Sequence, residues 1–83
     1  MSKKRMEDIA GAAAQLVFEY EGWGCEHVSD MFRTYEECGE TAPCDFDSFG
    51  EACALMQKYK DEGLDYFTAQ KKLVEEDTLA ILG

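Results

Sequence analysis

The sequence has almost no positive charge over its first two thirds. Between Met6 and Gln57 the one basic residue is Arg33, whereas twelve residues of this stretch are Asp or Glu, so its net charge is −11. The whole chain of 83 residues carries a net charge of −10. Such a balance repels nucleic acid and anionic lipid, and it favours basic partners or simple solubility. We therefore expect no direct binding to nucleic acid.

Long apolar runs are also missing. The longest uncharged run, residues 9–18, is far shorter than the roughly 20 apolar residues that a membrane-spanning helix needs. The basic start of the chain is typical of a signal peptide, but Glu7 and Asp8 stand where the apolar part of such a peptide belongs. We expect no membrane span, no signal peptide and a cytoplasmic location. In that compartment the cysteines stay reduced.

Proline occurs once, at Pro43, within residues 39–45, which we expect to form the longest loop. Apolar residues make up 46 % of the chain and ten residues are aromatic, which favours a folded globule over disorder. A chain of this length forms one domain with one modest core. We assign residues 1–83 to a single helical domain and expect residues 1–4 to fray.

The clearest helix is predicted within residues 44–63. Asp47 or Ser48 can cap its start, and Glu51 follows Ser48 by three residues, as a capping box requires. Gly63 supplies a left-handed stop. The core side of this helix is a stripe at helical spacing, made of Phe49, Ala52, Cys53, Met56 and Tyr59.

The same spacing predicts three further helices: residues 4–21 ending at Gly22, residues 26–38 ending at Gly39, and one capped by Asp65. Asp77 and Thr78 can break the last helix before residues 79–82. The slim segment 11–14 of the first helix would allow another helix to approach closely. The expected core stripes are Met6, Ile9, Ala10, Ala13, Leu16, Val17 and Tyr20; Val28, Met31, Phe32, Tyr35 and Cys38; and Phe67, Leu73, Val74 and Ile81. The fold class is all-α, a compact bundle of about four short helices, with Leu16, Phe32, Phe49, Met56 and Phe67 buried together.

Catalytic and metal-binding motifs are sparse. Cys25 and His27 could form a nucleophile and base, but residues two apart on a helix do not face each other. Tetrahedral zinc could use Cys25, His27, Cys38 and Cys44, although their spacing lacks the two-residue gap of zinc knuckles. We expect no enzyme and no cofactor, with a zinc-binding domain as a further alternative.

The acidic residues around the second predicted helix form the candidate site. They could be a solvated surface, or a recognition face that occupies the basic groove of a partner and imitates phosphate spacing. The loop 39–45 can bring them to one edge of the bundle. The candidate partner-binding residues are Glu26, Asp30, Glu36, Glu37, Glu40, Asp45, Asp47 and Glu51.

In composition the chain resembles phage-encoded inhibitors, including anti-CRISPR proteins and DNA mimics, which are short, acidic and without catalytic motifs. This resemblance implies an inhibitor that occludes a basic surface of a nucleic-acid-handling protein complex. The alternative is a helical module that forms a homodimer or a subunit through apolar faces. Salt separates the two hypotheses, because ionic strength weakens an acidic contact more than an apolar one.

Overall fold

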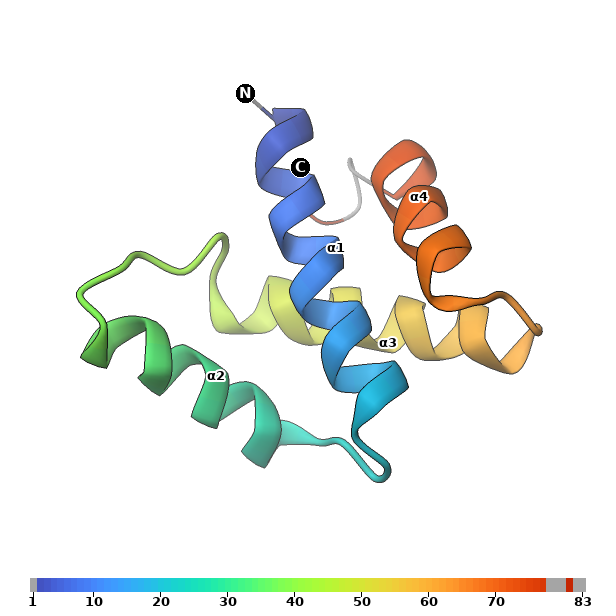
Figure 1. Cartoon of the computed structure of the whole chain (residues 1–83). Coiled ribbons are helices and arrows are strands. Elements are labelled where there is room, and N and C mark those ends of the chain that lie inside the picture. The colour runs from blue at the N-terminus through green and yellow to red at the C-terminus, as the bar shows by residue number, and fades with distance from the viewer. Residues whose placement is uncertain (1, 78–80, 82–83) are drawn as a thin grey trace.

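The computed structural model describes residues 2–77 and 81. It contains helices α1 (Ser2–Glu19), α2 (Cys25–Glu37), α3 (Phe46–Asp61) and α4 (Tyr66–Glu76), and the described residues include no strand (Figure 1). The predicted all-α bundle of four helices is therefore confirmed. The predicted helical segment 79–82 lies largely outside the described residues.

Helices α1, α3 and α4 form the packed part of the bundle. Helix α1 crosses α3 and also packs against α4, and α4 packs against α3 (Figure 1). Helix α2 packs against α3 and lies to one side of this unit. One side of α1 is therefore left with little to cover it.

The core lies mainly between α1 and α3, and α4 adds Ala69 and Leu73 to it. Phe49, Met56 and Ile9 are fully buried there, and burying a side chain of this size stabilises the fold by about 1.5–3 kcal/mol. All five residues of the predicted α3 stripe are buried. The complete set of buried residues is Met6, Ile9, Ala10, Ala13, Ala14, Leu16, Val17, Val28, Cys44, Phe49, Ala52, Cys53, Met56, Tyr59, Ala69, Leu73 and Ile81.

Helices α2 and α3 end just before Gly39 and Gly63 as predicted, whereas α1 ends at Glu19, two residues earlier than the predicted end before Gly22. Gly22, Gly39 and Gly63 have φ angles of 67°, 74° and 96°, a left-handed region that favours glycine because it has no Cβ. Asp65 caps α4 as predicted, since its carboxylate accepts a hydrogen bond of 2.8 Å from the backbone N–H of Thr68.

The predicted cap of α3 is wrong. Asp45, and not Asp47 or Ser48, is the N-cap, and its carboxylate accepts from the backbone N–H of Ser48 at 3.3 Å. The earlier start places Phe46 in the first turn, where its ring packs edge-on against Phe32, 5.8 Å between centroids. An additional aromatic contact therefore accompanies the longer helix.

Some predicted core positions are also wrong. Phe67 is 76 % exposed, because α4 faces the core through Ala69 and Leu73, and Phe67 lies two residues from that stripe. Tyr66 turns inward instead and packs edge-on against Phe18. Tyr20 is 44 % exposed, since α1 ends at Glu19.

On α2 the predicted core stripe is mostly uncovered. Val28 is its one buried member; Met31, Phe32 and Tyr35 are half-buried and Cys38 is exposed. The physical reason is that α2 packs against α3 and scarcely meets α1.

The slim segment of α1 is used inside the chain. Ala13 and Ala14 are fully buried, and a Cβ placed on Gly11 would lie 3.8 Å from the Gln70 Oε1 of α4. Within this segment only Gly11 and Ala12 are left partly exposed to a second copy of the chain. In the part of the chain that the structure describes, no helix combines the length and apolarity needed to cross a bilayer.

Candidate interaction surface

Helix α2 is held to α3 mainly by aromatic rings. Phe32 packs edge-on against Phe49 and Phe46, with ring centroids 5.6 and 5.8 Å apart. Val28 is buried beside them. These contacts fix the side of α2 that faces α3 and leave its other apolar residues toward α1.

The turn between α1 and α2 is fastened to α3 by the one tryptophan. The indole N–H of Trp23 donates to the side-chain oxygen of Gln57 at 2.8 Å. Gln57 in turn donates to Asp61 at 3.0 Å. This chain of hydrogen bonds sets where α2 begins relative to α3.

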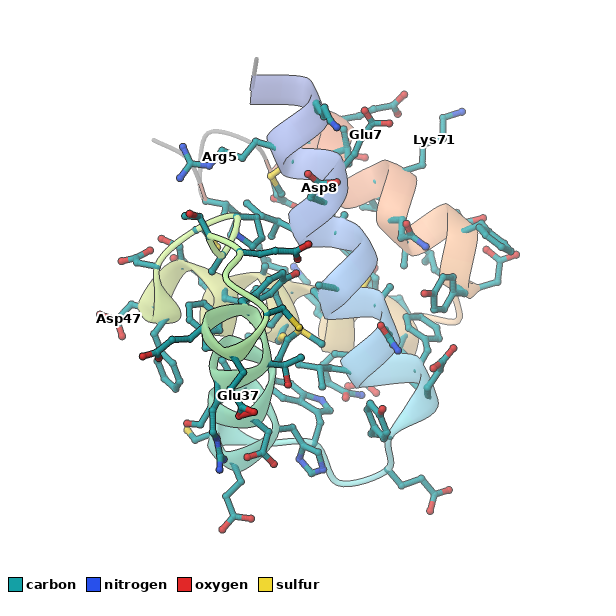
Figure 2. The ribbon with its side chains drawn as sticks, turned by 60° about the vertical axis from the view of Figure 1, so that its left-hand side comes forward. Arg5, Glu7, Asp8, Glu37, Asp47 and Lys71 are labelled. Carbon is teal, nitrogen blue, oxygen red and sulfur yellow. The ribbon has the colours of Figure 1, made fainter. Side chains whose placement is uncertain are left out.

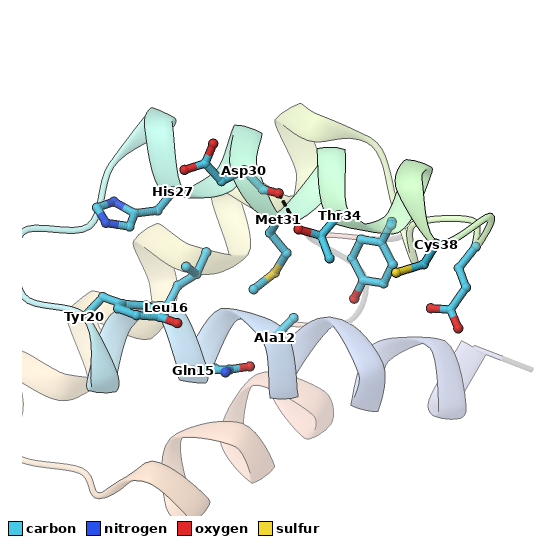
Figure 3. A pocket seen from close by; sticks show the side chains of 11 residues that line it. Ala12, Gln15, Leu16, Tyr20, His27, Asp30, Met31, Thr34 and Cys38 are labelled. Carbon is cyan, nitrogen blue, oxygen red and sulfur yellow. Dashed lines mark hydrogen bonds between the residues drawn. The ribbon is translucent and has the colours of Figure 1, made fainter.

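A groove with a volume of about 500 Å³ runs between α1 and α2. Met31 from α2 and Ala12 from α1 point toward each other across it, and the Thr34 hydroxyl donates to the Asp30 carbonyl oxygen on its α2 wall (Figure 3). Many of its lining side chains are exposed, so it is an open groove and not an enclosed cavity. The lining residues are Ala12, Gln15, Leu16, Tyr20, His27, Asp30, Met31, Thr34, Tyr35, Cys38 and Glu40.

One end of the groove is formed by two stacked rings. The rings of Tyr20 and His27 lie 5.7 Å apart between centroids with an angle of 25° between their planes. The Nδ1 atom of His27 is buried and has no hydrogen-bond partner among the residues that the structure describes. An unpaired polar atom of this kind is uncommon in a folded protein and calls for an explanation.

The other end of the groove continues into a second hollow. The two share Ala12, Gln15, Tyr35 and Glu40, and the second adds Asp8, Thr41 and Pro43. Among the described side chains, neither hollow is lined by a lysine or an arginine. The groove is therefore apolar along its floor and acidic at its margins.

All eight candidate partner-binding carboxylates are exposed. Figure 2 shows Glu37 of α2 and Asp47 of α3 on one side of the molecule, with Lys71 of α4 on the other. The one salt bridge found among the described residues joins Arg33 to Asp30, and its side chains are about two-thirds exposed. We name these eight residues the acidic edge: Glu26, Asp30, Glu36, Glu37, Glu40, Asp45, Asp47 and Glu51.

Within the acidic edge Asp45 also has a structural role. Its carboxylate caps α3, and hydrogen bonding by Ser48 lowers the pKa of Asp45. Nearby, the Arg5 guanidinium of α1 donates to the Pro43 carbonyl oxygen and ties the loop to α1. Arg5 is thus a local cation beside an otherwise acidic loop.

Two raised pKa values in this region reflect burial first and nearby negative charge second. Burial raises the pKa of Tyr35, and the carboxylates of Asp8 and Glu40 raise it further. Burial also raises the pKa of the Cys44 thiol to about 11, with a smaller contribution from Asp45. Both groups are held in the neutral form, as nearby negative charge and poor solvation require.

The residues of the zinc alternative do not come together. Cys25 and Cys38 are exposed, near opposite ends of α2, whereas Cys44 is buried. Within residues 2–77 and 81, no three side chains of His, Cys, Asp or Glu form a group that could hold a metal ion.

Sequence reasoning did not identify the α1 wall of the groove. Asp8, Ala12 and Gln15 follow one another at helical spacing and so share a face of α1. Sequence spacing alone places these three residues on one face of α1. Because only one of them is apolar, the spacing does not predict a binding surface there. For His27 the sequence suggests only the roles of metal ligand or base.

Compared with models of protein families, with curated proteins and with solved structures, the chain matches none.

Proposed function

We propose that this protein is a non-enzymatic interaction protein whose acidic edge binds a basic surface of a protein partner. The observation that carries the proposal is the exposure of eight carboxylates on α2, its following loop and the start of α3, of which Asp30 alone has a salt bridge within the described residues. A surface with so few counter-charges of its own attracts a partner that supplies them.

The opposite side of the molecule makes this arrangement directional. Lys58, Lys60, Lys71 and Lys72 lie on α3 beyond its midpoint and on α4. Lys60 also donates to the Val17 carbonyl oxygen at 3.1 Å. With these four lysines and six acids, residues 58–83 carry a net charge of −2, against −11 for residues 6–57, so a basic partner is attracted more strongly toward α2.

Proteins that handle nucleic acid are the partner class with extended basic grooves, because they neutralise phosphates with lysine and arginine. Inhibition by occupying such a groove is the form of this function that the composition favours. Carboxylates that act together through a field would weaken binding only slightly when removed singly, since an exposed ion pair contributes about 0.2–1 kcal/mol.

The test is affinity capture from a native lysate with matched charge reversals. The edge variant carries Glu36→Lys, Glu37→Lys and Glu40→Lys, all at exposed positions. We expect wild-type protein to retain basic proteins at low salt and to lose them at high salt, and the edge variant to retain none. Helix content by circular dichroism should stay unchanged, since these side chains are outside the core.

The control variant reverses three acids elsewhere: Glu62→Lys, Glu75→Lys and Glu76→Lys. These positions are also exposed at helix C-termini, and both variants change the net charge from −10 to −4. The control should retain the same proteins as the wild type. Equal loss in both variants would show that only net charge matters, and equal retention would reduce the acidic edge to a solubility device.

A further inference from the structure

The groove between α1 and α2 has the dimensions of a helix-binding site. Its α2 wall extends from His27 to Cys38, which at 1.5 Å per residue is about 16 Å, or three turns of a facing helix. Its other wall is α1, from Ala12 to Tyr20. Two roughly facing helices with a hollow between them are the usual receptor for the apolar face of a third.

The floor and the margins of the groove differ in chemistry. Ala12, Leu16 and Met31 give an apolar floor, and methionine adapts its shape to different partners. Glu40 stands at its margin and Asp8 in the adjoining hollow, whereas the Asp30 carboxylate is paired with Arg33. A ligand for this site therefore needs an apolar stripe flanked by positive charge.

We propose that the α1–α2 groove binds an amphipathic helix of a partner protein, with the apolar side chains of that helix on the floor and its lysines or arginines against Asp8 and Glu40. This inference rests on the proposed function, and it names the secondary structure and the chemistry of what is bound. The acidic edge attracts the partner, and the groove holds it.

Charge selects this occupant over a second copy of the chain. The protein has a net charge of −10, and its acidic edge borders the groove, so a second copy would bring like charge against like charge. A basic helix brings the opposite sign.

The test measures the affinity of a synthetic peptide of leucine and lysine, about 18 residues long, with its leucines on one helical face. A second peptide replaces each leucine with serine and keeps the charge. We expect the leucine peptide to bind at least about tenfold more tightly than the serine peptide. Raising the salt concentration should weaken both.

Two alanine variants locate the binding site. Ala12→Leu fills part of the groove and should weaken binding of the leucine peptide by about tenfold or more, because the added side chain occupies the floor. Ala54→Leu is the matched control: Ala54 is an exposed residue of α3 outside the groove, and its replacement should change nothing. Thr34→Lys, at an exposed wall position, should repel the lysines and weaken binding without depending on how well Ala12→Leu folds.

The outcomes separate this proposal from the proposed function. Equal binding of the two peptides, abolished by the edge variant, would overturn the groove and keep the acidic edge. If the leucine peptide binds tightly and neither Ala12→Leu nor Thr34→Lys weakens it, the peptide binds elsewhere on the molecule and the groove proposal is overturned. A dimer in sedimentation that Ala12→Leu dissociates would make a second copy the occupant. Failure of both peptides to bind would overturn both proposals.

Discussion

Helix α2 and the three-helix unit of α1, α3 and α4 both have apolar residues at helical spacing, but they differ in how far those residues are buried by packing against other helices. Each helix of the three-helix unit packs against the other two, and the unit contains nearly all of the buried side chains. Helix α2 packs on α3 through Phe32 and buries only Val28 completely. The unit therefore stabilises the fold, whereas α2 keeps an apolar stripe and a row of carboxylates available.

The helix ends repeat this difference. Asp45 and Asp65 cap α3 and α4 with side-chain hydrogen bonds, whereas α2 begins at Gly24, which has no side chain to cap it. Its first N–H groups are consequently not met by a side-chain acceptor at the cap. Weak local attachment is common in segments that bind partners, because they can adjust at little cost.

The largest expected effect comes from breaking the three-helix unit. Phe49→Ala should cost about 3–5 kcal/mol in urea unfolding, since Phe49 is fully buried. Phe67→Ala is the matched control and should change stability by less than about 0.5 kcal/mol, because Phe67 is mostly exposed. Similar losses in the two variants would mean that the assignment of core and surface is wrong.

Alkaline pH should also act on the three-helix unit. Burial raises the pKa of the Cys53 thiol to about 12 and of the Cys44 thiol to about 11, from an ordinary value of 9.0. The unfolded chain then loses protons first, so the stability from these thiols is complete below pH 9 and is lost as pH rises through 11 to 12.

The check is the urea midpoint as a function of pH. Cys53→Ala should lower stability at neutral pH but flatten the decline above pH 9, whereas Cys38→Ala, at an exposed position, should decline as the wild type does. Parallel curves for all three proteins would contradict the assigned burial of Cys53.

A smaller and more local effect is expected from Val28→Ala. Removal of two buried methyl groups should lower the free energy of unfolding by about 1–2 kcal/mol. Since Val28 is the one fully buried residue of α2, amide hydrogen exchange should accelerate throughout α2 and little in α1 or α3. Uniform acceleration over all helices would show that α2 unfolds only with the rest.

The smallest expected effect strengthens α2. Gly24 has an extended backbone, and a Cβ there would meet nothing within 4 Å. Gly24→Ser should therefore supply a cap and add a few tenths of a kcal/mol. Slower amide exchange in the first turn of α2, with α4 as the internal reference, is the measurement. A loss of stability would mean that Gly24 is needed for another reason.

The stripe of α3 was predictable because large residues repeat there at helical spacing and glycine marks the end. The face of α4 was not, because its inward position is occupied by the small Ala69 while the larger Phe67 dominates the hydrophobic pattern. The cap of α3 was not predictable because Asp45, Asp47 and Ser48 are all residues that can cap a helix, and spacing alone does not choose among them.

The candidate site divides in the same way. Exposure of the acidic edge followed from charge alone, since unpaired carboxylates are rarely buried. The groove did not follow, because it depends on the position of α2 relative to α1, which the contacts of Phe32 and Trp23 with α3 determine. Asp8 and Gln15 acquire a place in the site only through that geometry.

The most direct test of the central claim is a nuclear magnetic resonance titration of the full chain with the leucine and lysine peptide. The account predicts that amide shifts concentrate on both walls of the groove, in α1 from Ala12 to Tyr20 and in α2 from His27 to Cys38, while α4 stays unchanged. Shifts confined to α4, or spread evenly over the surface, would contradict it.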